Sequence, residues 1–168
     1  INVKKSNLNW AVVNIRSITK NYFQGKYILI FPFCSPKLSK KKWPYYSILI
    51  SQLKSKYNRK YDVVVAPGPN EIREAKLLNA HILLNEGKSI EINELISLIK
   101  DASFIISNDT GPAHICSHMD KHGLVLFGSH TTAHKVSIET DKFKAISVKD
   151  LNLLKAETVM KEVKKVLN

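Results

Sequence analysis

The chain has 168 residues, of which 44% are hydrophobic and 24% charged, as expected for one globular domain with a sizeable core. Its net charge of +12 predicts anionic partners such as nucleic acid, anionic lipid or phosphorylated sugars. No apolar run approaches the roughly 20 residues of a membrane span, no signal peptide opens the chain, and its two cysteines exclude a disulfide framework or a zinc finger.

Short apolar runs alternate with amphipathic segments along the chain. The expected strands cover 26–33, 61–66, 80–84, 103–107, 123–127 and 145–148, and the expected helices cover 43–57, 70–78, 91–100, 112–119 and 153–167. This alternation predicts an α/β fold, a Rossmann-like parallel sheet with helices on both faces. Ligands of such sheets bind at the carboxyl ends of the strands, so the loops that leave strands are the informative ones, at 34–43, 67–70, 108–111 and 128–132.

The first 25 residues do not follow the alternation. Ala11, Ile15, Ile18 and Tyr22 share one helical face, and Gly25 could end such a helix. We expect residues 1–25 to form a connecting helix or linker and residues 26–168 to form one domain. The alternative is an ordinary N-terminal helix packed on that same domain.

The densest group of polar residues follows the fourth expected strand, from Ser107 to His114. Gly111 would let a ligand approach the backbone, and the N–H groups at the start of the next helix favour an anion. Thr110 would add a hydroxyl donor, and His114 would contact the same anion from one turn into the helix. The alternative is a plain helix N-cap formed by Asp109 or Thr110.

Two further loops leave strands with polar residues of chemical interest. Ser35 to Pro44 is a lysine-rich loop whose ammonium groups could clamp a diphosphate. Its alternative is a solvated basic loop. We expect Trp43 to pack into the core rather than to form a platform for base stacking. Glu71 would lie at the start of a helix that Asn70 caps, where its carboxylate could accept hydrogen bonds from ribose or sugar hydroxyls. The alternative for Glu71 is a favourable interaction with the helix dipole.

A metal site is not expected. His114 and His118 share a helix face, but Cys116 points away from it and the glutamate of the H-E-x-x-H motif is absent. The sequence also lacks a Ser-His-Asp hydrolase signature, a GxGxxG fingerprint and a P-loop.

Four motifs together resemble glycosyltransferase family 9, the family of bacterial lipopolysaccharide heptosyltransferases. They are SPKLSKKKWP at 35–44, PGPNE at 67–71, NDTGPAH at 108–114 and GLVLFGSHTT at 123–132. The first is similar to the family's G-S/T…K-R-W-P, and the third to its N-D-T/S-G-x-x-H. The motifs occur in the family's order and spacing, and the resemblance covers roughly residues 26 to 150.

The resemblance implies the GT-B architecture of two Rossmann-like domains, of which this chain is similar to the C-terminal, donor-binding one. In the family that domain holds a nucleotide diphosphate sugar, typically ADP-heptose. By position, Lys41 resembles the lysine that neutralises the donor phosphates, and Glu71 resembles the acid that contacts the nucleoside. The helix-start phosphate and sugar site corresponds to Asp109, Thr110, Gly111 and His114, and the hydroxyl of the first loop corresponds to Ser35.

The resemblance further implies an inverting transferase that moves a heptose-like sugar to a lipopolysaccharide-type acceptor by direct displacement, without a metal or a cofactor. The family's catalytic base is an aspartate of the N-terminal domain, and it has no counterpart here. We therefore assign no catalytic residue and expect the chain alone to be inactive. Pro112 stands where heptosyltransferases often have a bulkier apolar residue, which leaves the identity of the sugar open.

The expected partners are the nucleotide-sugar donor, an anionic glycolipid acceptor and an N-terminal GT-B domain, with no specific nucleic acid. The expected location is the cytoplasm, with peripheral attachment to the inner face of the cytoplasmic membrane. Three alternatives stay open. They are a non-catalytic nucleotide-sugar-binding module, a nucleic-acid-binding α/β domain suggested by the +12 charge, and an epimerase with the GT-B fold and a pair of catalytic carboxylates.

Overall fold

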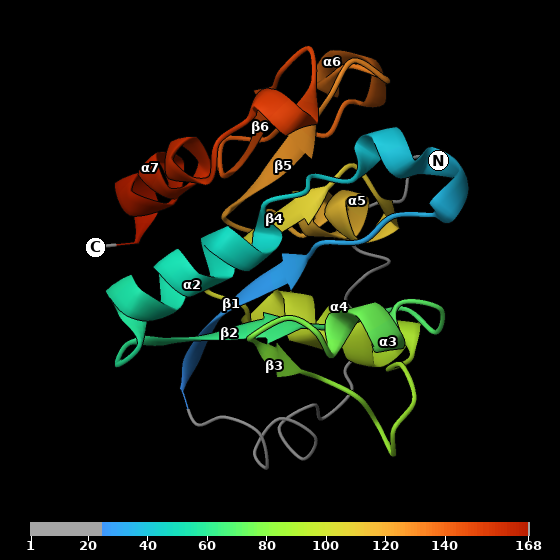
Figure 1. Cartoon of the computed structure of the whole chain (residues 1–168), viewed down its shortest axis with the longest axis vertical. Coiled ribbons are helices and arrows are strands. Elements are labelled where there is room, and N and C mark those ends of the chain that lie inside the picture. Colours follow the sequence, from blue (N-terminus) through green and yellow to red (C-terminus); the bar gives the residue numbers. More distant parts are fainter. Residues whose placement is uncertain (1–24, 168) are drawn as a thin grey trace.

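In the computed structural model, which describes residues 25–167, six parallel strands form one sheet (Figure 1). They are β1 (Lys26–Phe31), β2 (Tyr61–Val65), β3 (His81–Ile82), β4 (Phe104–Asn108), β5 (Gly123–Phe127) and β6 (Phe143–Ser147). The strand order is β3-β2-β1-β4-β5-β6, so the chain reverses its direction of travel across the sheet between β1 and β4. In open α/β sheets, that switch point is where ligands bind.

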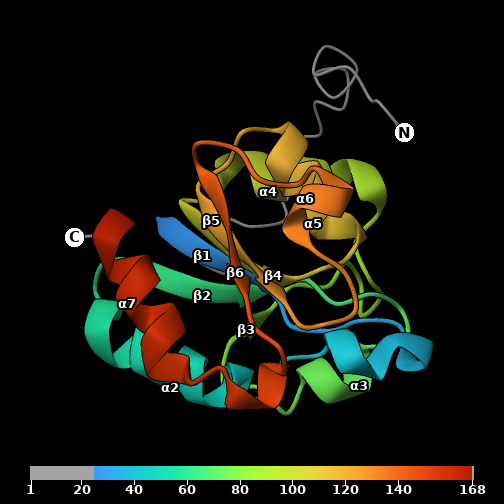
Figure 2. The same cartoon turned by 90° about the horizontal axis from the view of Figure 1, so that it is seen from above.

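Helices cover both faces of the sheet (Figure 2). One face carries α2 and α7, and the other carries α4, α5 and α6. The helices are α2 (Tyr46–Tyr57), α3 (Ile72–Ala75), α4 (Ile92–Asp101), α5 (Gly111–His118), α6 (Ala133–Val136) and α7 (Ala156–Val166), with 3₁₀ segments η2 (Pro36–Lys41) and η3 (Leu151–Leu153). The described residues include no helix long and apolar enough to cross a membrane.

Strand β1 shows why the apolar runs form a sheet that is buried on both faces. Ile28 and Ile30 pack into the core beneath α2 and α7, whereas Leu29 and Phe31 pack into the core beneath α4 and α5. Successive side chains of a strand point to opposite faces, so a run without polar alternation needs cover on both sides. The predicted Rossmann-like α/β architecture is thereby confirmed.

Trp43 belongs to the core. Its side chain is buried, and its ring Nε1–H donates a hydrogen bond of 2.8 Å to the carbonyl oxygen of Leu154. The ring also meets Tyr46 edge to face, with centroids 4.9 Å apart. The packing interpretation of Trp43 is confirmed, and this residue ties the start of α2 to the segment before α7.

The structure differs from the sequence-based expectations at several element ends. Helix α2 begins at Tyr46 rather than at Trp43 because the chain first passes through Pro44, and the 3₁₀ segment η2 was not predicted. Helix α3 has one turn, and its N-cap is Glu71, so the expected cap at Asn70 is wrong. Strand β3 is reduced to two residues at the sheet edge. The expected connecting helix over 1–25 lies outside the described residues, apart from Gly25.

Candidate functional site

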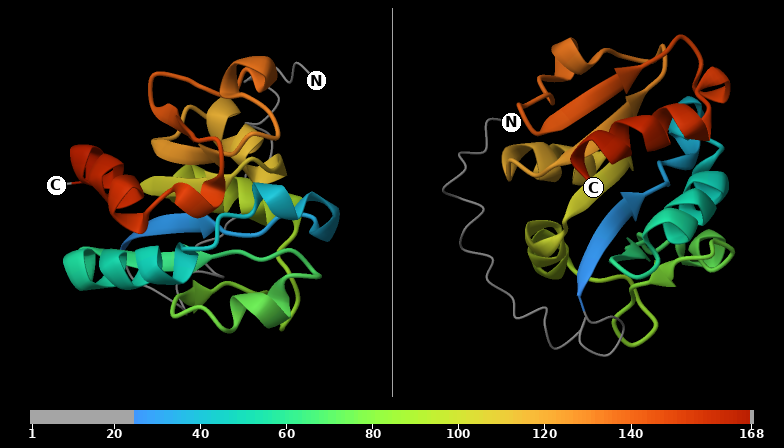
Figure 3. Two further views of the ribbon diagram at one scale, coloured as in Figure 1. Left: turned by 45° about the horizontal axis from the view of Figure 1, so that its top comes forward. Right: turned by 90° about the vertical axis from the view of Figure 1, so that its left-hand side faces the viewer.

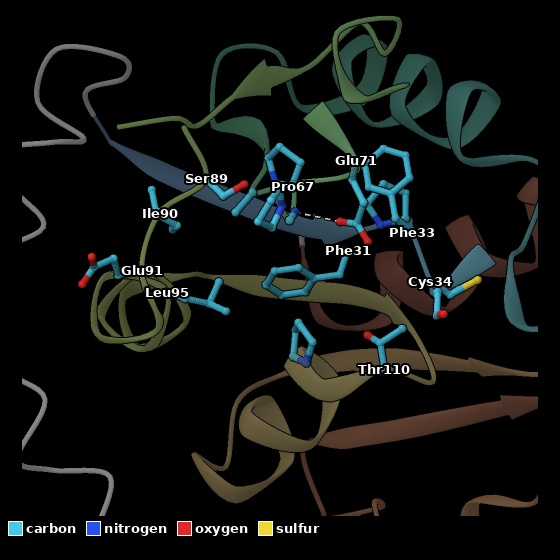
Figure 4. Close-up of a pocket in the computed structure, with 16 residues that line it drawn as sticks. Phe31, Phe33, Cys34, Pro67, Glu71, Ser89, Ile90, Glu91, Leu95 and Thr110 are labelled. Carbon is cyan, nitrogen blue, oxygen red and sulfur yellow. Dashed lines mark hydrogen bonds between the residues drawn. The ribbon is translucent and has the colours of Figure 1, made fainter. Parts of the chain in front are cut away.

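The carboxyl ends of β1, β2 and β4 open into a cavity of about 490 Å³ (Figure 4). Figure 3 shows the η2 segment beyond the arrowhead of β1, at this same edge of the sheet. Of the residues predicted from the motifs, Ser35, Glu71 and Thr110 line the cavity. They come from three loops that are separated in sequence and are brought together by the order of the central strands.

Glu71 is held in place by its own turn. Its Oε2 accepts a hydrogen bond of 2.8 Å from the Gly68 N–H, and the Glu71 N–H donates to the Gly68 carbonyl. In Figure 4 the carboxylate lies at the cavity wall between Pro67 and Phe33. The remaining lone pairs of the carboxylate can accept hydrogen bonds from hydroxyl groups of a ligand.

The start of α5 is open toward a ligand. Thr110 is the N-cap residue, but its side chain makes no capping hydrogen bond, so the alternative interpretation, a plain side-chain cap, is wrong. Pro112 has no N–H, and the N–H groups of Ala113 and His114 donate to the Thr110 carbonyl. Gly111 therefore carries the helix-start N–H that can face an anion, and a Cβ added there would meet no atom within 4 Å.

Beside the cavity, three basic side chains surround the carboxylate of Asp109. The Lys41 Nζ lies 2.6 Å from Asp109 Oδ2, the His130 Nε2 lies 3.1 Å from the same oxygen, and the His114 Nε2 lies 3.7 Å from Oδ1. The Asp109 side chain is only 3% exposed. We call Lys41, Asp109, His114 and His130 the Asp109 cluster.

The charge state of Asp109 follows from this setting. Burial raises the pKa of the carboxyl, but the neighbouring His114, Lys41 and His130 outweigh burial and hold its pKa well below the usual range. At 3.7 Å the His114 contact is too long for a hydrogen bond, so we attribute most of the lowering to Lys41 and His130. Asp109 is thus a carboxylate whose oxygens already face basic side chains of the protein itself.

Lys41 can still act on a ligand from this position. One of its three ammonium hydrogens is directed to Asp109, and 22% of the side chain is exposed. The predicted residues thus fall into two neighbouring groups. Ser35, Glu71 and Thr110 line the cavity, with Gly111 at the adjoining helix start, whereas Lys41, Asp109 and His114 form a cluster beside it.

Two residues of this region were not predicted from the sequence. His130 lies in the loop after β5, stacks on the Phe127 ring at 5.9 Å between centroids, and contacts Asp109. The signal was its place in the loop 128–132, which leaves a strand at the ligand-binding edge. Asn108 is fully buried; it opens the NDTGPAH motif at 108–114, but the motif assigned it no role.

Asn108 holds the basic loop next to Asp109. Its Nδ2 donates to the Pro32 carbonyl at 2.9 Å, and its Oδ1 accepts from the Tyr46 hydroxyl at 3.1 Å and from the Trp43 N–H at 3.3 Å. These bonds fix both ends of the segment that contains η2 onto the end of β4. Lys41 reaches Asp109 because this amide sets the path of the loop.

The histidines and the cysteine of α5 do not gather as metal ligands do. Within residues 25–167, no group of three or more His, Cys, Asp and Glu side chains is arranged to hold a metal ion. Cys116 is fully buried in the core beneath α4 and α5, and burial raises the pKa of its thiol. His118 instead bonds through Nδ1 to the carbonyl of His114 at 2.8 Å.

Comparison with solved structures shows what this fold is similar to. Escherichia coli heptosyltransferase WaaC with ADP is 19% identical with a TM-score of 0.73, over 90% of this chain and 48% of that chain. E. coli ADP-heptose lps heptosyltransferase II is 17% identical with a TM-score of 0.73, over 99% of this chain and 53% of that chain. The chain therefore spans about half the length of these proteins.

A more distant likeness extends to epimerases. A putative UDP-N-acetylglucosamine 2-epimerase from Listeria monocytogenes is 16% identical with a TM-score of 0.67, over 97% of this chain and 43% of that chain. At such identity the likeness concerns the fold alone. No curated protein matches the sequence.

The family model of glycosyltransferase family 9 (heptosyltransferase) matches residues 7–166, almost the whole chain. This match agrees with the four motifs and with the Rossmann-like sheet whose switch point carries the cavity. The chain therefore belongs to glycosyltransferase family 9.

Proposed function

We propose that this chain binds a nucleotide diphosphate sugar, ADP-linked, as the C-terminal donor-binding domain of an inverting glycosyltransferase. The full enzyme would transfer a heptose-like sugar to a lipopolysaccharide-type acceptor. The observation that carries the proposal is the cavity at the switch point of the sheet, where Glu71 and Thr110 face the same space beside Lys41. The solved relatives with ADP and with ADP-2-deoxy-2-fluoro heptose support the choice of donor.

The walls of the cavity suit a nucleoside diphosphate. Apolar side chains such as Ile90, Leu95 and Pro112 would contact the base, and the Glu71 carboxylate would accept hydrogen bonds from the ribose hydroxyls. The diphosphate would lie against the Thr110 hydroxyl and the Gly111 N–H at the start of α5. Ser35 would add a further hydroxyl from the loop after β1.

In this proposal the Asp109 cluster stabilises the leaving group. Negative charge grows on the diphosphate as the bond to the sugar breaks, and the Lys41 ammonium and the α5 start would stabilise that charge. His114, 41% exposed, would contact the phosphate or the sugar from the helix. Asp109 is buried beneath the basic groups, so its role would be to position Lys41 and His130 rather than to meet the phosphate. Such a site requires neither a metal nor a cofactor.

The remaining parts of the reaction are assigned outside this chain. Glu71, Glu91 and Asp109 are the acids in or beside the cavity. Glu71 and Asp109 have the roles above, and Glu91 forms the capping box of α4 with Glu94, so the base would be an aspartate of an N-terminal GT-B domain. The anionic glycolipid acceptor would bind in the cleft between that domain and this chain, with the enzyme at the inner face of the cytoplasmic membrane. We expect the 168-residue chain alone to show no sugar transfer, and no specific nucleic acid as a partner.

Calorimetric titration with ADP, UDP and GDP tests the proposed donor site. We expect ADP to bind more tightly than UDP or GDP, although weakly. Lys41→Gln should lower the affinity for ADP by about ten- to a hundredfold, because one charge-assisted hydrogen bond is worth about 1.5–3 kcal/mol. Lys37→Gln is the matched control, since Lys37 is an exposed lysine of the same loop. Equal losses in the two variants would assign the binding to the general positive field. Absence of binding by any of the three nucleotides at millimolar concentration would contradict the proposal.

A further inference from the structure

A second cavity lies at the carboxyl edge of the sheet, and its wall is mainly polar. It shares no lining residue with the proposed donor cavity. Its volume is about 400 Å³. Its walls come from the loops after three strands, with Ser39, Lys40 and Lys42 following β1, Gly128 and Ser129 following β5, and residues 149–152 following β6. We call this space the β5–β6 cavity.

The walls of the β5–β6 cavity are fixed by contacts between its loops. The Val148 N–H donates to the Phe127 carbonyl at 2.9 Å, which holds the chain after β6 against the end of β5. The Tyr45 hydroxyl donates to the Asn152 carbonyl at 2.8 Å. A Cβ added at Gly128 would lie 3.6 Å from the Lys40 carbonyl oxygen, so the β1 and β5 loops are in close contact. The cavity is therefore formed before any ligand arrives.

The charge of this cavity favours an anion. Lys40 and Lys149 contribute ammonium groups, and Lys42 lies in the same wall, against the single carboxylate of Asp150. That carboxylate is engaged within its own turn, since its Oδ1 accepts from the Asn152 N–H at 2.9 Å and from the Asn152 Nδ2 at 2.8 Å. Lys42 is paired with Glu74, whereas within residues 25–167 neither Lys40 nor Lys149 forms an ion pair.

The hydrogen-bond donors of the cavity match a phosphate group. The hydroxyls of Ser39 and Ser129 lie in the wall together with the lysines, and both serines are exposed. Ammonium groups bind phosphate as point charges, and hydroxyl donors can reach its remaining oxygens. These lysines and serines should therefore bind a dianionic phosphate ester more strongly than a singly charged carboxylate.

Two residues of the Asp109 cluster, Lys41 and His130, are sequence neighbours of residues that line this cavity. Lys41 is directed to Asp109, while its sequence neighbours Lys40 and Lys42 line the β5–β6 cavity. His130, which also contacts Asp109, follows Gly128 of the same cavity by two residues. We propose that the β5–β6 cavity binds a phosphate group of the acceptor, next to the donor but independently of it. This placement rests on the proposed donor function.

Nuclear magnetic resonance of the full chain tests this site with two probes, inorganic phosphate and glucose 6-phosphate, each with and without saturating ADP. We expect both probes to shift the backbone amides of Ser39, Ser129 and Lys149, and the shifts to persist with ADP. Replacing Lys40 and Lys149 together by glutamine should lower the affinity for both probes about tenfold or more. The matched control replaces Lys88 and Lys144, two exposed lysines away from the cavity, and should leave the affinity nearly unchanged.

Three results would overturn the inference. Equal weakening in the two double variants would show attraction by the overall charge. Loss of the shifts on adding ADP would assign the cavity to the donor phosphates. Binding of inorganic phosphate without glucose 6-phosphate would exclude a phosphorylated acceptor group. A chain that binds both probes here and fails to bind ADP would contradict the proposed donor site while supporting the phosphate cavity, so the two failures are distinguishable.

Discussion

Replacing Gly123 by alanine is expected to lower the free energy of unfolding by about 3 kcal/mol, because the added methyl group has no space. Gly123 opens β5 and pairs with Ile105 of β4 on one side and with Phe143 of β6 on the other. A Cβ at this position would collide with the carbonyl oxygen of Ile105 and would lie 2.7 Å from a ring carbon of Phe143. The carbonyl belongs to a central strand, so it cannot withdraw without disturbing the β4–β5 pairing.

Urea unfolding followed by circular dichroism measures this loss. The matched control is Gly111→Ala, where an added Cβ meets no atom within 4 Å, so its stability should change by less than about 1 kcal/mol. Equal stability of the two variants would mean that the sheet accommodates the methyl group at Gly123. A large loss confined to Gly123→Ala would show that the close approach of β4, β5 and β6 at this residue requires a glycine.

The fold could be predicted because its main signals are local. The runs 26–31, 61–65 and 123–127 are almost wholly apolar, with Lys26 and Asp62 as the charged exceptions, which is typical of strands covered on both faces. Turn residues separate these runs from amphipathic helices. Element ends were less predictable. A helix was expected over 70–78, yet α3 covers only Ile72–Ala75. Its last residue, Ala75, is buried in the core.

The sequence could predict which residues lie at the candidate site, but not the contacts between them. The motifs placed Lys41 and Asp109 at the ligand-binding edge, but their mutual contact joins residues that are 68 positions apart. That contact depends on β1 and β4 being neighbours and on Asn108 fixing the basic loop, and neither is visible in a local pattern. His130 was overlooked for the same reason, because its importance comes from Asp109 rather than from its own motif.

Asp109→Asn is the change expected to affect the candidate site most, with a loss of about 2 kcal/mol of unfolding free energy at pH 7. The carboxylate is 3% exposed and accepts hydrogen bonds from Lys41 and His130, and hydrogen bonds to charged groups contribute about 1.5–3 kcal/mol. Asparagine keeps the shape but not the charge. The loss stays below that of a fully buried ion pair because 22% of the Lys41 side chain is exposed and its ammonium can turn to water.

The pH dependence of this loss identifies the carboxylate as its source. The pKa of Asp109 is lower in the folded chain than the usual value of about 3.9 for an unfolded chain, so its contribution is fully present above that value. As the pH falls below about 4, the unfolded chain takes up a proton that the folded carboxylate does not, and the contribution is lost. The stability gap between wild type and Asp109→Asn should therefore be widest at pH 7 and shrink at pH 3.

Urea unfolding of both proteins across this pH range measures the gap, with Asp141→Asn as the matched control. Asp141 is exposed, so its replacement should leave both the stability and its acid sensitivity close to wild type. A gap that stays constant from pH 7 to pH 3 would show that the variant loses packing rather than charge. A gap between wild type and Asp109→Asn that closes on acidification, with no such change for Asp141→Asn, would establish that the negative charge of Asp109 holds Lys41. Lys41 then owes its position at the candidate donor site to that carboxylate.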